Sequence, residues 1–301
     1  MKHKIILALS LGPLKLLARL PFRLLYGLSD GIAFLLEKVI RYRREVIVNN
    51  LRRSFPEKSA CEIQQIVRRY YRHMGDLIVE SVKLLHISDR QLEEHICVKQ
   101  GELIERLAAD GRSVIVFLGH YGNWEWVQEV TRHYSRPQLN AEIYRPIKDP
   151  VSNSIMSTIR SRFDTMLIPQ KQAVRTLLRL NKEGRQFLVG FIADQRPNSK
   201  NLYHWTHFLN QDTAYATGGE EIGSHLNCHF VYLDVEKPSR GHYVMTFHEM
   251  KPSKEYEGQA NPYTLLFLRL MEQTIRREPA YWLWSHNRWE FDREGNTIQK
   301  K

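Results

Sequence analysis

The chain has 301 residues, a formal net charge of +11 and a sequence pI near 9.5. This length allows one large domain, or one domain with an appendage. The positive charge indicates an anionic partner, which is a nucleic acid, an anionic membrane or an acidic protein. Three widely spaced cysteines, Cys61, Cys97 and Cys228, form no CxxC pair. They predict neither a disulfide framework nor a zinc site.

The first sixth of the chain is both basic and apolar. Residues 1–53 hold 11 Lys and Arg against 3 acids, a balance of 11 − 3 = +8. This combination is typical of a segment that binds a membrane surface, and it argues against nucleic acid as the partner. Lys15, Arg19 and Arg23 interrupt every apolar window of the roughly 20 residues that a transmembrane helix needs.

We therefore expect residues 1–40 to form an N-terminal membrane anchor, and residues 41–301 to form the main domain. Helices over 5–26 and 24–40 would lie in the interface, with Lys and Arg at anionic headgroups. The alternative is that 24–40 is a core helix of the globular domain. An interfacial helix and a core helix differ in whether one apolar face stays exposed.

The middle and end of the chain alternate short strands with helices. Apolar spacing predicts a helix over 57–85, with Ser59 as N-cap and Glu62 completing a capping box. Strands are expected at 114–119, 140–146, 166–169, 185–194, 229–236 and 242–250, and helices at 123–134, 150–163, 171–182, 216–226 and 259–277. This order predicts an α/β fold with a mixed central sheet flanked by helices.

The segment FLGHYGNWEWV (117–127) places a histidine at the end of a buried strand and a carboxylate five residues later. Reactive groups of α/β sheets collect where strands end at their carboxyl edge. His120 is suited to general base catalysis if a carboxylate holds its second ring nitrogen, and Glu125 is near enough to do so. No GxSxG motif or nearby cysteine supplies a nucleophile, so the base would activate a hydroxyl or amine of the substrate. The alternative is a buried histidine beside an exposed helix-start glutamate.

HYGNWE resembles the HxGNWE signature of the bacterial lipid A late acyltransferases, within the HxxxxD/E glycerolipid acyltransferase superfamily. Further similar blocks follow in the family's order: YRREVIVNNLRRSFPE (42–57), YRPIKDP (144–150), IADQRP (192–197) and YWLWSHNRWE (281–290). They cover nearly the whole chain from residue 41 to 290. An apolar, basic N-terminal anchor is also typical of the family.

The resemblance implies a membrane-associated acyltransferase with no cofactor, whose donor is a thioester of acyl-carrier protein or coenzyme A. His120 would deprotonate a hydroxyl of a lipid A precursor at the cytoplasmic side of the bacterial inner membrane, with Glu125 orienting the ring. The expected substrate-binding residues are Asn123, Arg145, Arg160, Arg162, Asp194 and Gln195.

These assignments have structural alternatives. Arg145 suits an oxyanion donor or a clamp for an acceptor phosphate. Arg160 and Arg162 fit the same anionic site or a solvated helix face. Asp194 fits a position beside His120 or a structural cap. Arg288 is expected to pair with a core carboxylate or to stack on a tryptophan.

The acceptor is the least constrained part of the prediction. Residues 201–223 match the family's pattern after the DQ block loosely, and a GGEE run stands where many members have a Gly-Pro-Ala type run. An O-acyltransferase for an aminolipid such as an ornithine or glycine lipid, or for another membrane lipid, is therefore an alternative. A non-catalytic lipid-binding protein is a third hypothesis.

Overall fold

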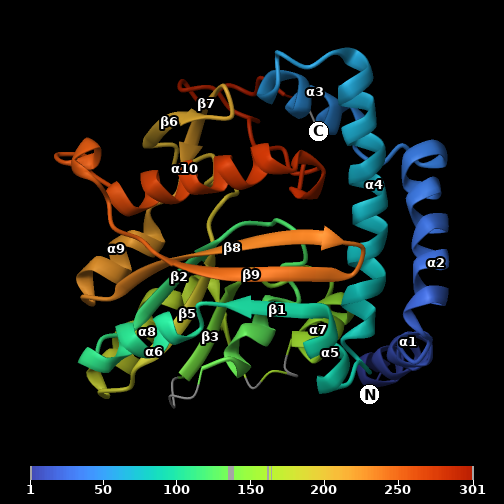
Figure 1. Ribbon diagram of the computed structural model, residues 1–301, viewed down its shortest axis with the longest axis horizontal. Helices are drawn as coiled ribbons and strands as arrows, with labels where there is room; N and C mark the ends of the chain where they lie inside the picture. Colours follow the sequence, from blue (N-terminus) through green and yellow to red (C-terminus); the bar gives the residue numbers. More distant parts are fainter. Residues whose placement is uncertain (1, 135–138, 161–162, 164, 300–301) are drawn as a thin grey trace.

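The centre of the molecule is a mixed sheet of order β1-β9-β8-β2-β5-β3-β4 (Figure 1). The computed structural model describes residues 2–134, 139–160, 163 and 165–299. Strands β8 and β9 are antiparallel, and the other neighbouring pairs are parallel. The strands are β1 (Ile96–Lys99), β2 (Val114–Leu118), β3 (Leu139–Tyr144), β4 (Met166–Pro169), β5 (Phe187–Ile192), β8 (His229–Ser239) and β9 (His242–Glu249). The predicted α/β fold with a mixed sheet is confirmed.

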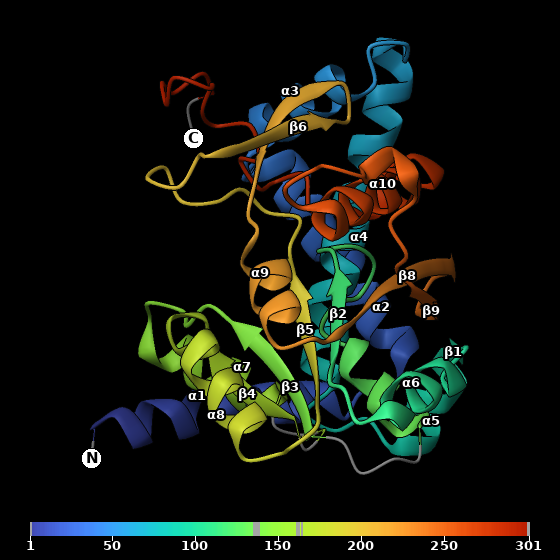
Figure 2. The same ribbon diagram turned by 90° about the vertical axis from the view of Figure 1, so that its left-hand side faces the viewer.

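Helices cover the sheet because its central strands are apolar on both faces. All five residues of β2 are buried, as expected for a strand inside a parallel sheet. Helices α9 and α10 contact β2, and α10 also contacts β8, while α6 contacts β9 and α8 contacts β4 (Figure 2). The helices of this part are α5 (Asp89–His95), α6 (Glu102–Leu107), α7 (Pro150–Arg160), α8 (Ala173–Lys182), α9 (Gly218–His225) and α10 (Pro262–Arg277).

Two parts of this region differ from the prediction. The helix expected over 123–134 is wrong: Asn123 to Trp126 form a turn, and a 3-10 helix follows at Val127–Arg132. The side chains of Asn123 and Trp126 both donate hydrogen bonds to Glu80, and these contacts hold the segment in place. Its backbone hydrogen bonds are of the i→i+3 type. A separate hairpin of β6 (His204–Phe208) and β7 (Gln211–Tyr215), together with β1, was not predicted.

The N-terminal third is helical. It consists of α1 (Lys2–Ala18), α2 (Phe22–Phe34), a π-helix η1 (Leu35–Val39), α3 (Arg44–Ser54) and α4 (Ala60–Lys83). The capping box of Ser59 and Glu62 at the start of α4 is confirmed. Across residues 2–134, 139–160 and 165–299, no helix combines the length and apolar character needed to cross a membrane.

Helix α2 has one packed face and one exposed face. Leu25, Ser29 and Ala33 are buried, and α2 lies along α4 (Figure 1). Several large apolar side chains of α2, η1 and the turn after them are exposed, namely Leu24, Leu28, Phe34, Leu35, Val39 and Ile40. The helix therefore both contributes to the core and presents an apolar outer surface.

The close contact of α2 with α4 depends on Gly75. A Cβ at this position would lie 2.5 Å from the carbonyl oxygen of Ser29, whereas a Cβ at Gly27 on α2 would meet nothing within 4 Å. Alanine in a helix interior is favoured over glycine by about 1 kcal/mol. We expect Gly27→Ala to raise the free energy of unfolding by up to this amount. Gly75→Ala should lower it, because the clash forces α2 away from α4.

Urea unfolding of both variants measures this difference, and limited proteolysis of residues 19–43 reports on α2 directly. Equal stabilisation by the two alanines would show that the helices do not pack as closely as described.

Candidate active site

Two neighbouring strands bring His120 and Asp194 together. His120 lies two residues beyond the end of β2 and Asp194 two residues beyond the end of β5, and these strands are parallel partners. The Nδ1 atom of His120 lies 2.7 Å from Oδ1 of Asp194, and the backbone N–H of His120 donates to Oδ2 at 2.8 Å. The side chain of Asp194 is 1% exposed, while that of His120 is 19% exposed. The imidazole of His120 is therefore partly open to solvent, whereas the carboxylate that contacts it is buried.

A third donor fixes the Asp194 carboxylate. The indole N–H of Trp282 donates to Oδ2 at 2.7 Å. Burial raises the pKa of the Asp194 carboxyl, but His120, Trp282 and the backbone N–H together lower this pKa below its ordinary value. Gly119 makes room for the arrangement, since a Cβ there would lie 2.5 Å from the side chain of Met271. An ionised carboxylate with both oxygens engaged holds the imidazole in one orientation.

The hydrogen bonds leave the second ring nitrogen of His120 as the reactive one. With Oδ1 of Asp194 as acceptor, Nδ1 carries the hydrogen and Nε2 carries the lone pair. The side-chain amide of Gln195 lies 3.2 Å from Nε2, and the ring of Trp124 packs edge-on against the imidazole at 5.3 Å. Sequence reasoning placed Asp194 and Gln195 near His120, and the structure confirms this position.

Glu125 has a different partner from the one expected. Its carboxylate forms a bidentate pair with the Arg160 guanidinium, at 2.9 Å to Nε and 2.8 Å to Nη2. The carboxylate that contacts Nδ1 of the His120 imidazole belongs to Asp194 and not to Glu125. The reason is topological: the strand partner β5 delivers Asp194 to the ring, whereas the turn after Gly122 directs Glu125 toward α7. A catalytic role for Glu125 stays a prediction.

Arg160 lies between two carboxylates. Oε1 of Glu142 is 3.9 Å from its Nε atom, in addition to the pair with Glu125. Burial lowers the pKa of the Arg160 guanidinium, but its bonds to Glu125 raise this pKa above the ordinary value. Burial raises the pKa of the Glu142 carboxyl, and Arg160 opposes that shift incompletely. Because its charge is already compensated, Arg160 is poorly suited to bind a further anion.

The other predicted arginines are placed differently. Arg145 is exposed and lies one residue beyond the end of β3, the strand next to β5. It is therefore at the same edge of the sheet as His120 and Asp194. Arg162 lies outside the described residues.

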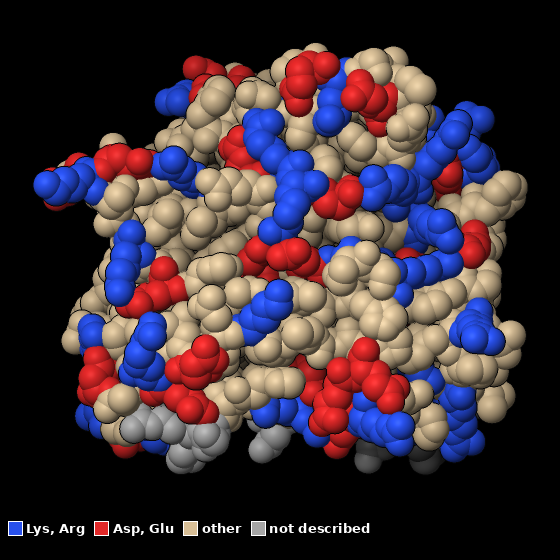
Figure 3. Space-filling model, viewed as in Figure 1, with Lys and Arg blue, Asp and Glu red and all other residues tan. Residues whose placement is uncertain are grey.

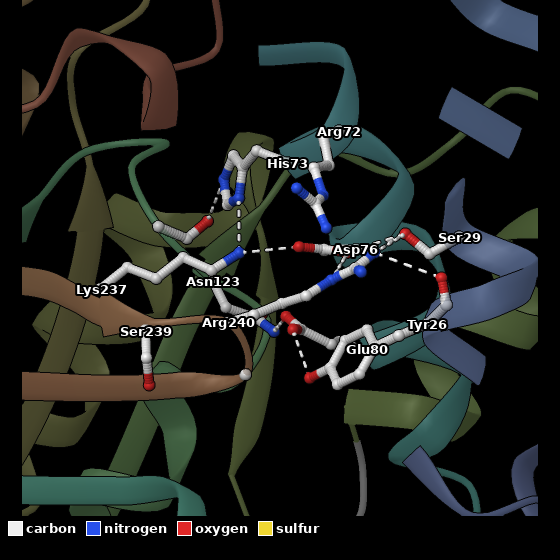
Figure 4. A network of polar contacts seen from close by, with 12 residues as sticks. Tyr26, Ser29, Arg72, His73, Asp76, Glu80, Asn123, Lys237, Ser239 and Arg240 are labelled. Atoms are coloured by element: carbon white, nitrogen blue, oxygen red, sulfur yellow. Dashed lines mark hydrogen bonds and ion pairs between the residues drawn. The ribbon is translucent and has the colours of Figure 1, made fainter. Parts of the chain in front are cut away.

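The loop that carries the HYGNWE motif is attached to α4 (Figure 4). Asn123 accepts a hydrogen bond from the backbone N–H of Trp126 and donates to Oε2 of the buried Glu80 at 2.8 Å. His73 contacts the carbonyl oxygen of Gly122 through Nε2 at 3.1 Å. Gly122 has a φ of +59°, a left-handed conformation that favours glycine. Asn123, expected to contact substrate, is fully buried and has a structural partner.

Sequence reasoning missed Trp282, Glu80 and His73. The signal for Trp282 was present in the YWLW block, which runs beside the motif: the N–H of Leu283 donates to the carbonyl of His120 at 3.1 Å. Glu80 and His73 lie on an amphipathic helix, where nothing in the spacing separates them from surface residues. Arg288 is fully buried, and its guanidinium nitrogens have no hydrogen-bond partner among the described residues, so the expected pairing with a core carboxylate is not seen.

The family model of bacterial lipid A biosynthesis acyltransferases matches residues 1–290. The chain belongs to this family. It is 21% identical over 290 residues to the lipid A biosynthesis lauroyltransferase of Escherichia coli K12, covering 95% of this chain and 92% of that protein. It is 24% identical over 284 residues to the lipid A biosynthesis palmitoleoyltransferase of the same strain, covering 93% of this chain and 90% of that protein. The resemblance read from the sequence blocks is confirmed.

The contact between Asn123 and Glu80 can be tested by an isosteric change. Asn123→Asp keeps an oxygen that accepts from the Trp126 N–H but places a second carboxylate against Oε2 of Glu80. We expect Asn123→Asp to lower the free energy of unfolding more than Asn123→Ala, for which the loss of two buried hydrogen bonds suggests about 1–3 kcal/mol for each. Urea unfolding near neutral pH provides the comparison.

The excess cost of Asn123→Asp should shrink as the pH falls, because burial raises the pKa of Glu80 and a proton shared by the two carboxyls removes the repulsion. An Asn123→Asp variant as stable as the wild type at neutral pH would contradict the contact.

Proposed function

We propose that this member of the family transfers a fatty acyl chain from the thioester of acyl-carrier protein or coenzyme A to a hydroxyl of a lipid A precursor. The observation that carries the proposal is the His120–Asp194 pair at the carboxyl edge of the sheet, with Nε2 directed away from the carboxylate. Mass spectrometry of lipids from a deletion strain tests it. A lipid A lacking one acyl chain supports it, whereas loss of an acylated aminolipid would favour the alternative acceptor.

The chemistry follows from the orientation of the ring. Nε2 of His120 takes the proton of the acceptor hydroxyl as its oxygen attacks the thioester carbonyl carbon. Asp194 stabilises the imidazolium that forms. The tetrahedral intermediate then collapses, its C–S bond breaks, and the thiolate takes the proton back from Nε2. The products are an ester and a free thiol, so no enzyme nucleophile and no cofactor is required.

An apolar pocket beside the histidine suits the acyl chain. It is lined by side chains of β2 and β5, including Leu118, Leu188 and Ile192, and by Trp124, which packs on His120. Its volume is about 50 Å³. An acyl chain would therefore have to displace the walls as it enters, and one of these walls is the short 3-10 helix at Val127–Arg132.

Of the two predicted arginines that the structure describes, Arg145 is better placed for an anion than Arg160. It is exposed at the same sheet edge as His120, and Pro146 restricts the backbone that follows. We assign it to the oxyanion or to an anionic group of the acceptor. We assign Glu125 to holding Arg160, and Gln195 to contact with the substrate beside Nε2.

Residues 1–40 are proposed to bind the cytoplasmic surface of the inner membrane. Six exposed apolar side chains lie between Leu24 and Ile40, and Arg19, Arg23, Lys38 and Arg41 flank them. Apolar groups buried below the headgroups, with Lys and Arg beside anionic lipids, are typical of interfacial helices. On this proposal the active site receives its thioester donor from the cytoplasm and its lipid acceptor from the membrane.

Asp194→Asn should disable the base without removing a side chain. Oδ2 accepts from two donors, so the Asn oxygen must take that position and its amide must face Nδ1. The amide then donates to Nδ1, which moves the ring hydrogen to Nε2 and removes the lone pair that accepts the proton. We expect kcat for acyl transfer to fall about 10²–10⁴-fold, as for His120→Ala.

Glu125→Gln provides the matched control, since it neutralises a carboxylate in the same site that does not contact the ring, and its effect should be smaller. The opposite order, with Asp194→Asn nearly fully active and Glu125→Gln inactive, would assign the orienting role to Glu125.

Phe34→Glu tests the membrane surface. Phe34 is 60% exposed, so the change should leave the fold intact while placing a charge in the apolar patch. The fraction bound to vesicles of phosphatidylethanolamine and phosphatidylglycerol should fall several-fold, because burial of an aromatic side chain contributes about 1.5–3 kcal/mol. Val174→Glu, at a 56% exposed site on α8, is the control and should bind as the wild type. Equal loss in both variants would indicate charge repulsion alone.

A further inference from the structure

A second pocket, which is polar, lies beside the attachment of the motif loop to α4, since His73 both lines it and contacts the Gly122 carbonyl. It is formed by α4, by the end of the β8–β9 hairpin and by Tyr281, and it has a volume of about 200 Å³. This is room for several water molecules and therefore for a tetrahedral anion. Four cationic side chains line it: Arg69, Arg72, Lys237 and Arg240. None of them belongs to the proposed catalytic site.

Positive charge exceeds negative charge in the wall of this pocket. Asp76 is the carboxylate among the lining side chains, and it pairs with Lys237 at 3.1 Å and with Arg240 at 2.6 Å. Two further acids lie at the rim, Glu278 against Arg69 at 2.5 Å and Asp30 against Arg240 at 2.8 Å. The lining side chains thus carry four cations and one carboxylate; outside the lining, Asp30 is 50% exposed, Glu278 is 26% exposed, and the buried Glu80 interacts with Lys237.

The guanidinium of Arg72 has N–H donors that are available to a ligand. Its contact with Asp30 is 3.4 Å long, and the two side chains are 61% and 50% exposed. Exposed pairs of this kind contribute little, so an incoming anion can replace Asp30 at low cost. Figure 4 shows the Arg72 side chain directed toward Asp76 and Arg240, into the centre of the cationic group.

The base of the pocket is held in place before any ligand arrives. Lys237 is 3% exposed and lies 3.2 Å from Nδ1 of His73, whose Nε2 contacts the Gly122 carbonyl. Burial and the charge of Lys237 keep the pKa of His73 well below its ordinary value, so the ring is neutral: Nε2 donates and Nδ1 accepts. Buried ion pairs add little net stability, whereas fixed donors reduce the entropic cost of binding.

The position of the pocket indicates where its ligand comes from. Asp30 and Tyr26 of α2 border it, and the exposed apolar side chains of α2 and η1 lie on the same helical layer. On the face drawn in Figure 3, blue side chains gather over α4 where it passes the end of the β8–β9 hairpin. A ligand that reaches this pocket from a membrane bound at α2 is the headgroup of a lipid.

We propose that Arg72 binds the phosphate of a lipid headgroup, supported by the positive charge of Arg69, Lys237 and Arg240, whose own donors are engaged by carboxylates. Phosphate oxygens suit guanidinium groups because two parallel N–H donors meet two oxygens. The inference rests on the proposed membrane association. The phosphate belongs either to the acceptor lipid or to a neighbouring phospholipid, and both supply the same chemistry.

Arg72→Ala and Arg68→Ala form a matched pair for the test. Both arginines are exposed on α4 and both variants lose one positive charge, but Arg68 does not line the pocket. In the first arm, full-length protein is titrated with phosphatidylcholine vesicles containing phosphatidic acid. In the second, the KM for a phosphate-bearing acceptor lipid is compared with the KM for the same lipid after phosphatase treatment.

We expect Arg72→Ala to weaken binding about tenfold more than Arg68→Ala in at least one arm, the loss of roughly one charge-assisted contact. A rise in KM that disappears with the dephosphorylated lipid assigns the site to the acceptor. A change confined to the vesicle arm assigns it to a phospholipid. Equal behaviour of the two variants in both arms overturns the proposal. The vesicle arm needs no turnover, so it tests the pocket even if the proposed transfer fails.

Discussion

The Asp194 carboxylate is the interaction on which the rest of the site depends. It is almost fully buried, and each of its oxygens has a fixed donor: the imidazole on Oδ1, and a backbone N–H and the Trp282 indole on Oδ2. A buried carboxylate is costly unless it is hydrogen-bonded in this way. Three segments far apart in sequence, at 119–120, 194–195 and 282, must therefore meet at one point. The adjacency of β2 and β5 makes that meeting possible.

A second buried carboxylate, Glu80, organises the motif loop from the opposite side. Its Oε2 accepts from Asn123 at 2.8 Å and from Tyr243 at 2.7 Å, and its Oε1 accepts from Tyr26 at 3.0 Å. Its backbone carbonyl accepts from the indole of Trp126. One residue of α4 thus joins the motif loop, β9 and the N-terminal helix α2. A displacement of α2 would remove the Tyr26 donor from Glu80. It would thereby change the surroundings of the carboxylate that holds the loop carrying His120.

The sequence predicted the sheet well because its strands are short apolar runs between helical segments. Position in the sheet was also predictable for Asp194, since it follows a strand as His120 does. The partner of His120 was not: five-residue spacing suggested Glu125, but chain proximity does not determine side-chain direction after a left-handed glycine. Trp282, Glu80 and His73 act through contacts between residues more than 40 positions apart. Such contacts depend on tertiary packing, which periodicity does not encode.

The charges around the motif distinguish His120 from the two neighbouring imidazoles, those of His286 and His73. Nε2 of His286 lies 3.4 Å from the backbone N–H of Arg196 and accepts from it. Burial and the charge of Arg288 lower the pKa of His286 to about 3, so this ring stays neutral near pH 7. His73 is kept neutral by burial and Lys237, with both of its nitrogens engaged. Neither ring can become an imidazolium at low cost.

His120 differs because, within the described residues, a carboxylate and no cation contacts its ring nitrogen. The buried cations Arg288 and Lys237 each raise the free-energy cost of protonating the ring beside it, which is His286 for Arg288 and His73 for Lys237. His286 and His73 are thus kept neutral near pH 7, and His120 is the one of these three histidines whose ring nitrogen contacts a carboxylate in the described part of the chain. The guanidinium of Arg288 has no hydrogen-bond partner within the described part of the chain, and its effect on His286 acts through its charge and requires no hydrogen bond.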